Sequence, residues 1–161
     1  QRQLVETLRA LPAGRLESLV RVEKAEIGRY SGGVDRNGQP GHDAVRVYLN
    51  LFDQHGSQIK AAGDVTIQLY DLAAPPQENF LAEHAWKAEK LHERWAGGFI
   101  SNHYVFDCPR PERLAHEDVT VRLSFTDYLT GRSFTDQRVV KVELPARATG
   151  PAATTAPAAT D

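Results

Sequence analysis

The residues best suited by type and spacing to bind a ligand lie in the glycine-rich stretch 35–43, which reads DRNGQPGHD. Its side-chain oxygens alternate with glycines, an arrangement that suits a hard cation such as calcium. The ligands would be Asp35, Asn37 and Asp43. The stretch departs from an EF-hand loop, because glycine stands at the fourth position and no glutamate closes the loop. The alternative is a turn in which Asp and Asn accept hydrogen bonds from backbone N–H groups.

Three aspartates each end a run of alternating apolar and polar residues, namely Asp53, Asp71 and Asp127. If 45–53 and 59–71 pair as antiparallel neighbours, Asp53 and Asp71 lie at opposite ends, roughly 25 Å apart at about 3.3 Å per residue. The glycine-rich stretch would then enter the first strand close to Asp71. We therefore expect any calcium site to combine Asp71 with Asp35, Asn37 and Asp43. The alternative is that each strand-end aspartate caps a turn.

Aromatic residues cluster in the irregular middle of the chain, beside the pair of glycines at 97–98. Trp86, Trp95 and Tyr104 could form a platform on which a sugar ring stacks. Large rings also dominate apolar burial in a domain of this size. The favoured alternative is therefore that the same residues cover the core.

Other catalytic and metal signatures are missing from the sequence. Cys108 is the only cysteine, so no internal disulfide can form, and it is expected to be a buried apolar residue at a strand end. The six histidines show no short spacing typical of a zinc site, and there is no nucleophile elbow or phosphate-binding loop. We expect no enzymatic activity and no cofactor other than calcium.

Charge and hydropathy exclude further classes of partner. The net charge is −2, and basic residues are interspersed with acidic ones, so we expect no nucleic-acid partner. No apolar run is long enough to span a bilayer, so no transmembrane segment is expected. The chain starts at Gln1 and contains no Met, which indicates that a signal peptide, lipid anchor or helix could have preceded it.

The elements that must position these residues are strands. The stretches 45–53, 65–71 and 119–127 alternate apolar and polar residues, the pattern of half-buried strands. With the shorter runs, the pattern predicts a mainly β fold, an antiparallel β-sandwich of about seven to eight strands, C2-like or immunoglobulin-like. A short N-terminal helix and one short inserted helix would accompany it.

Several local predictions remain to be tested. The apolar phase of the first strand, 19–27, switches midway, which indicates a bulge or an edge position. The stretch 80–86 reads as a strand followed by a helix at 87–95, although a single helix over 79–95 also fits the spacing. The runs 119–128 and 133–144 should form a hairpin.

The two ends differ in composition from the sandwich domain, which we place at residues 16–145. Leu4, Leu8 and Leu11 indicate an amphipathic helix over 1–12, which packs on its own domain or is the remnant of a coiled coil that mediates self-association. Residues 146–161 contain Ala, Thr, Pro and Gly almost exclusively and are expected to be disordered.

Four features together resemble uncharacterised bacterial cell-envelope proteins: the leucine-spaced lead, the segment SGGVDRNG at 31–38, the insert 86–95 and the turn FTDYLTG at 125–131. In that family a lipoprotein-type start and a coiled coil precede a C2-like or immunoglobulin-like sandwich. The resemblance implies an extracytoplasmic, non-catalytic structural or interaction module that contacts a protein or a cell-wall component. The alternative is a calcium-dependent module that binds carbohydrate or lipid head groups.

Overall fold

The computed structural model describes residues 20–97 and 102–145. The helix predicted at 1–12, with its self-association, and the tail predicted at 146–161 lie outside the described residues. Within the described part, no helix has the length and apolar character needed to cross a membrane.

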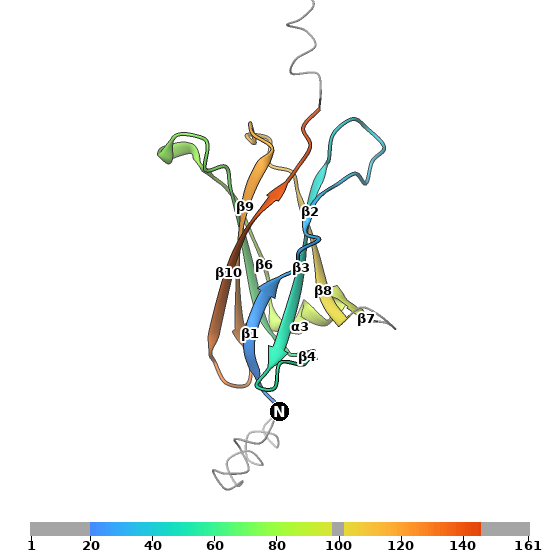
Figure 1. Cartoon of the computed structure of the whole chain (residues 1–161), viewed down its shortest axis with the longest axis vertical. Helices are drawn as coiled ribbons and strands as arrows, with labels where there is room; N and C mark the ends of the chain where they lie inside the picture. The colour runs from blue at the N-terminus through green and yellow to red at the C-terminus, as the bar shows by residue number, and fades with distance from the viewer. Residues whose placement is uncertain (1–19, 98–101, 146–161) are drawn as a thin grey trace, which may run out of the picture.

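The described residues form two antiparallel sheets packed face to face, so the predicted β-sandwich is confirmed (Figure 1). The first sheet, called sheet A here, has the order β1-β3-β8-β7, with two short strands that also pair with β3. It contains β1 (Val22–Ile27), β2 (Gly32–Val34), β3 (Ala44–Asp53), β4 (Gln58–Ile59), β7 (Trp95–Gly97) and β8 (Asn102–Pro109).

The second sheet, sheet B, has the order β10-β9-β5-β6. It contains β5 (Gly63–Tyr70), β6 (Phe80–Trp86), β9 (Asp118–Asp127) and β10 (Ser133–Lys141). The strand count exceeds the predicted seven to eight because β2, β4 and β7 are pieces of two or three residues.

Alternation builds the core as the sequence predicts. In β3 every second residue from Val45 to Leu51 is at most 1% exposed, and the residues between them face outward. Alternate residues of β5 and β9 face them from sheet B, among them Ile67 and Leu123, which are fully buried. Burial of these two inner faces is the main stabilising contribution to the fold.

The first strand is both an edge strand and irregular, as its phase switch indicates. β1 pairs only with β3 in its sheet, and its register shifts between Val22 and Lys24. The N–H of Ile27 donates a hydrogen bond to Asp136 Oδ2 on β10 at 2.8 Å. This bond joins the edges of the two sheets at one corner of the sandwich.

One predicted pairing is wrong. The segment 59–71 is broken near Gly63, as its sequence indicates, but it does not lie beside β3 along its length, because only Gln58 and Ile59 pair with β3 there. The chain then crosses to sheet B, where β5 pairs with β6 and β9. The crossing occurs just before Gly63, where the absence of a side chain permits close approach to β9.

The insert after Pro75 begins with a single 3-10 turn, η1 (Pro76–Glu78), and continues as a strand. Residues 80–86 form β6, and the helix that follows is short, with α3 (Ala88–Leu91) continuing into η2 (His92–Arg94). The alternative of one helix over 79–95 is therefore wrong. Pairing with β5 accounts for this outcome, since it places the half-buried Trp86 against the core.

The aspartates that end β3 and β9 cap turns, as the turn alternative predicts. Asp53 Oδ1 accepts hydrogen bonds from the N–H groups of His55 and Ser57 at 2.8 and 2.9 Å. Asp127 Oδ2 accepts from the Thr130 hydroxyl at 2.7 Å, within the predicted β9–β10 hairpin. Both turns lie at one end of the sandwich, while the loop 35–43 lies at the other (Figure 1).

Candidate functional site

The loop 35–43 uses its side-chain oxygens to hold its own backbone. Asp35 Oδ1 accepts hydrogen bonds from the N–H groups of Asn37 and Gly38, at 3.2 and 2.9 Å. Asn37 Oδ1 accepts from the N–H of Gln39 at 2.8 Å. These are the contacts of side-chain-capped turns.

Asp43, the third predicted ligand of this loop, is occupied by Arg36. It accepts hydrogen bonds from the Arg36 N–H group and, at 3.1 Å, from Arg36 Nε. The backbone hydrogen bond and then the guanidinium hold the pKa of Asp43 below its ordinary value. The carboxylate is therefore already neutralised by a cation of the protein.

The fourth predicted ligand, Asp71, follows β5 on sheet B and has other partners. Its side chain is fully buried, and its two oxygens lie 3.0 and 2.9 Å from His116 Nδ1. Asp71 Oδ2 also accepts from the N–H of Ala115 at 3.2 Å. Asp71 thus ties β5 to the loop before β9, a contact that no sequence spacing indicates.

The glycines of the loop 35–43 and its surroundings serve a packing role instead. His42 Nδ1 accepts the N–H of Glu143 at 2.8 Å, and the His42 N–H donates to the Glu143 carbonyl at 2.8 Å. A side chain on Gly33 would lie 2.2 Å from His42 Nδ1, and one on Gly41 would lie 2.8 Å from the nitrogen of Pro145. The loop therefore holds the segment that leaves β10.

The calcium prediction consequently has no specific support from geometry, and it has a direct test. Among residues 20–97 and 102–145, no three His, Cys, Asp or Glu side chains form a group that could hold a metal ion. We expect the melting temperature of the protein to be the same with millimolar calcium and with a chelator, because a cation bound only by the folded state would raise it. A calcium-dependent increase that disappears in Asp35→Ala would contradict this expectation.

The predicted aromatic platform lies on the inner side of the sandwich. Tyr104 is 2% exposed, and its hydroxyl donates to the Ala61 carbonyl at 2.8 Å, so its ring belongs to the core. The ring centroid of Trp95 is 5.0 Å from that of Tyr104, and Trp86 lies 4.6 Å from Phe106. Both tryptophans are half-buried covers of the core, and ligand binding by them stays a prediction.

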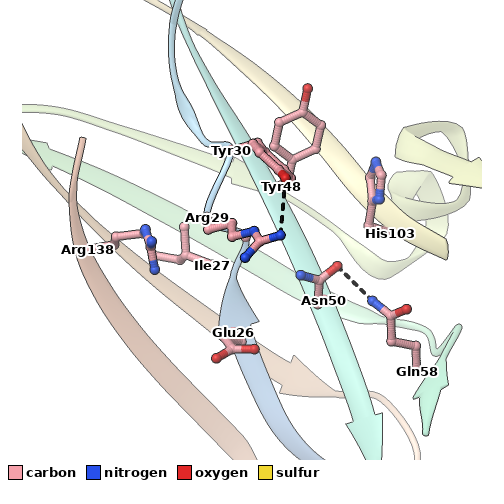
Figure 2. A pocket seen from close by; sticks show the side chains of 10 residues that line it. Glu26, Ile27, Arg29, Tyr30, Tyr48, Asn50, Gln58, His103 and Arg138 are labelled. Atoms are coloured by element: carbon pink, nitrogen blue, oxygen red, sulfur yellow. Dashed lines mark hydrogen bonds between the residues drawn. The ribbon is translucent and has the colours of Figure 1, made fainter. Parts of the chain in front are cut away.

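A pocket lies on the outer face of sheet A, over β1, β3 and β8 (Figure 2). Its volume is about 650 Å³, within the range of small-molecule sites. Outward-facing Tyr48 and Asn50 of β3 form part of its lining, with His103 of β8 on one side. The connection after β1, with Arg29 and Tyr30, lies on another.

Local backbone contacts fix the wall of this pocket. Gly28 donates its N–H to the Tyr48 carbonyl at 2.7 Å, and a side chain on Gly28 would lie 2.9 Å from Tyr48 Cβ. The Tyr48 N–H donates to Ser31 Oγ at 2.9 Å. Glycine is needed at position 28 because the connection lies directly against β3.

The ionisable groups of the pocket differ in their surroundings. Burial lowers the pKa of His103, whose ring meets Tyr48 edge-on with centroids 4.9 Å apart. Glu26 lies 3.7 Å from Lys24 Nζ. Neither Arg29 nor Arg138 forms an ion pair with a described carboxylate, which leaves two guanidinium groups available to a ligand.

Sequence reasoning missed this pocket, although two tyrosines gave a signal. Tyr48 occupies the outward, polar phase of a strongly alternating strand, where a large ring has no core to fill. Tyr30, 77% exposed, gives a second such signal. Their proximity depends on the turn of the chain at Gly28, which residue spacing does not reveal.

Side chains with nucleophilic or general-base chemistry lie apart. Cys108 is fully buried, and burial followed by the charge of Asp107 raises the pKa of its thiol to about 12. His116 has a carboxylate partner, but no described hydroxyl or thiol forms a hydrogen bond with it.

Comparison of the chain with models of known protein families, with curated proteins and with solved structures found no match.

Proposed function

We propose that this chain is a non-catalytic interaction module that binds a ligand or partner in the pocket on the outer face of sheet A. In line with the resemblance to bacterial cell-envelope proteins, we propose a partner of the envelope, either a protein or a cell-wall component. The observation that carries the proposal is the pocket itself, where two guanidinium groups that pair with no carboxylate of the described residues lie beside two tyrosines and two amides. Such a mixture of apolar surface and a few convergent polar groups is typical of binding sites.

The proposal of a non-catalytic role is supported by the separation of reactive groups. The buried Cys108 thiol stays protonated at neutral pH because its pKa is about 12. The Asp71–His116 pair lies at the end of the sandwich, where the described residues supply no nucleophile within hydrogen-bond distance of the imidazole. General acid–base catalysis and nucleophilic catalysis both require the reacting groups to lie within hydrogen-bond distance of one another.

Amide chemical-shift mapping tests the proposal. Uniformly labelled protein would be titrated with soluble cell-wall peptides and saccharides, and we expect shifts concentrated on Tyr30, Tyr48, Asn50 and His103. The amide signals of the loop 35–43 provide the internal control, and their chemical shifts should not change. Absence of any shift at the pocket at millimolar concentrations would contradict the proposal.

An assay for enzymatic turnover tests the non-catalytic part of the proposal. The protein should leave ester, phosphoester and glycoside substrates intact. Hydrolysis of any of them that a single substitution abolishes would show an enzyme and overturn the non-catalytic part of the proposal.

A further inference from the structure

We infer that the ligand of this pocket is an acidic saccharide, a sugar ring that carries a carboxylate. This inference rests on the proposed function, because it names the ligand class for the same pocket. It is carried by three properties of the lining: guanidinium groups without a described carboxylate partner, side-chain amides with remaining hydrogen-bonding capacity, and two tyrosine rings.

The cationic groups come from different sheets and face the same opening. Arg29 follows β1, and its Nη2 atom donates only to the Tyr30 hydroxyl, at 3.1 Å (Figure 2). Arg138 stands on β10 and is exposed. By contrast, Arg46 holds Asp107 through two hydrogen bonds of 2.7 and 3.0 Å. The two pocket guanidiniums have no such partner among described carboxylates, and guanidinium geometry favours carboxylate binding.

The pocket also contains one carboxylate, which limits how much negative charge a ligand can carry. Glu26 lines the opening and is only loosely paired with Lys24, at 3.7 Å. Burial keeps His103 neutral near pH 7 by lowering its pKa. Two guanidiniums and one carboxylate therefore leave a small positive charge, which suits a ligand with an isolated carboxylate better than a polyanion.

The amides supply donors and acceptors suited to hydroxyl groups. Gln58 Nε2 donates to Asn50 Oδ1 at 3.1 Å, which orients both side chains (Figure 2). This leaves the Asn50 amide N–H groups and the Gln58 carbonyl oxygen for a ligand. A sugar presents neighbouring hydroxyls that both donate and accept, so it can use both groups and the carboxylate of Glu26.

The rings distinguish a saccharide from a small inorganic anion. Tyr30 is 77% exposed, and Arg29 lies 5.0 Å from the centre of its ring. Tyr48 is half-buried, with its ring edge-on to His103. Aromatic rings with a polar tip offer apolar contact area and a hydrogen bond to the same ligand. The volume of about 650 Å³ also exceeds what a single anion would fill.

Isothermal titration with a short galacturonic acid oligomer and a neutral galactose oligomer of the same length tests the inference. We expect the acidic oligomer to bind about tenfold more tightly or better, because charge-assisted hydrogen bonds are the stronger ones. Arg29→Gln and Arg138→Gln should each remove most of that preference. Arg122→Gln, at an exposed arginine on β9 that does not line the pocket, is the matched control and should bind as the wild type does.

The possible outcomes separate the inference from the proposed function. Equal binding of both oligomers, with shifts at the pocket, would overturn the acidic ligand and leave the interaction module standing. No binding of either oligomer would also overturn the inference, while the wider shift-mapping panel would decide the proposed function. Melting temperatures of the variants, expected to match the wild type, exclude misfolding as the cause of lost binding.

Discussion

Replacing Gly63 with alanine is expected to lower the free energy of unfolding by about 3 kcal/mol, the cost of overpacking at a site that cannot relax. A Cβ atom at this position would lie 2.4 Å from the Thr126 carbonyl oxygen and 2.5 Å from Phe125 Cε1. The first is backbone of the central strand β9, and the second belongs to a fully buried ring. Relief of the clash requires β5 to separate from β9 at the start of their pairing.

Urea denaturation followed by tryptophan fluorescence measures this effect, and Gly56→Ala supplies the matched control. Gly56 has φ of +83° but nothing within 4 Å of an added Cβ, so its replacement should cost only about 1 kcal/mol. Gly63 has no positive φ, so a loss no larger than that of Gly56→Ala would show that β9 relaxes to accept the added Cβ and would contradict the prediction.

Replacing Asp71 with alanine is expected to lower the free energy of unfolding by about 2–3 kcal/mol at pH 7, since it removes a fully buried carboxylate together with the hydrogen bonds that it accepts. The Asp71 side chain is fully buried and accepts from both His116 and the N–H of Ala115. His116→Ala is the control. Its imidazole is 49% exposed and water can replace its contacts, so we expect a loss of less than about 1 kcal/mol.

The Asp71 contribution should also depend on pH, with a defined sign. Burial alone would raise the pKa of Asp71, but hydrogen bonds from His116 and Ala115 outweigh burial and lower it below its ordinary value of 3.8. A carboxyl group whose pKa is lower in the folded state than in the unfolded state stabilises the fold at pH values above its unfolded-state pKa. This stabilisation is lost as the pH falls through its folded-state pKa. The stability difference between wild type and Asp71→Asn should therefore be constant near neutrality and shrink below about pH 4.

Denaturation curves between pH 7 and 3 measure that difference. A gap between the two proteins that stayed unchanged down to pH 3 would show that Asp71 does not hold its charge through these contacts. In a His116→Ala background, this stability difference should begin to shrink at a higher pH, because the imidazole is the first of the groups that lower the Asp71 pKa.

Most of the strands could be predicted from the sequence because successive side chains of a strand point to opposite faces of the sheet, so buried and exposed residues alternate. The runs in β3, β5 and β9, the phase switch in β1 and the β9–β10 hairpin all follow from local pattern and turn chemistry. The turn-capping role of Asp53 and Asp127 is equally local, because each side chain bonds backbone within four residues.

Only the tertiary structure decided which sheet each strand joins and which side chains meet. Alternation is the same for a strand in either sheet, so it could not show that β5 lies in sheet B and pairs with β9 instead of β3. For the same reason it could not bring Asp71 to His116, 45 positions later, or Arg138 to the pocket beside Arg29. The sequence by itself determined the buried and exposed faces, because burial of apolar side chains has a fixed period along a strand. The candidate site depended on long-range pairing, for which local spacing carries no signal.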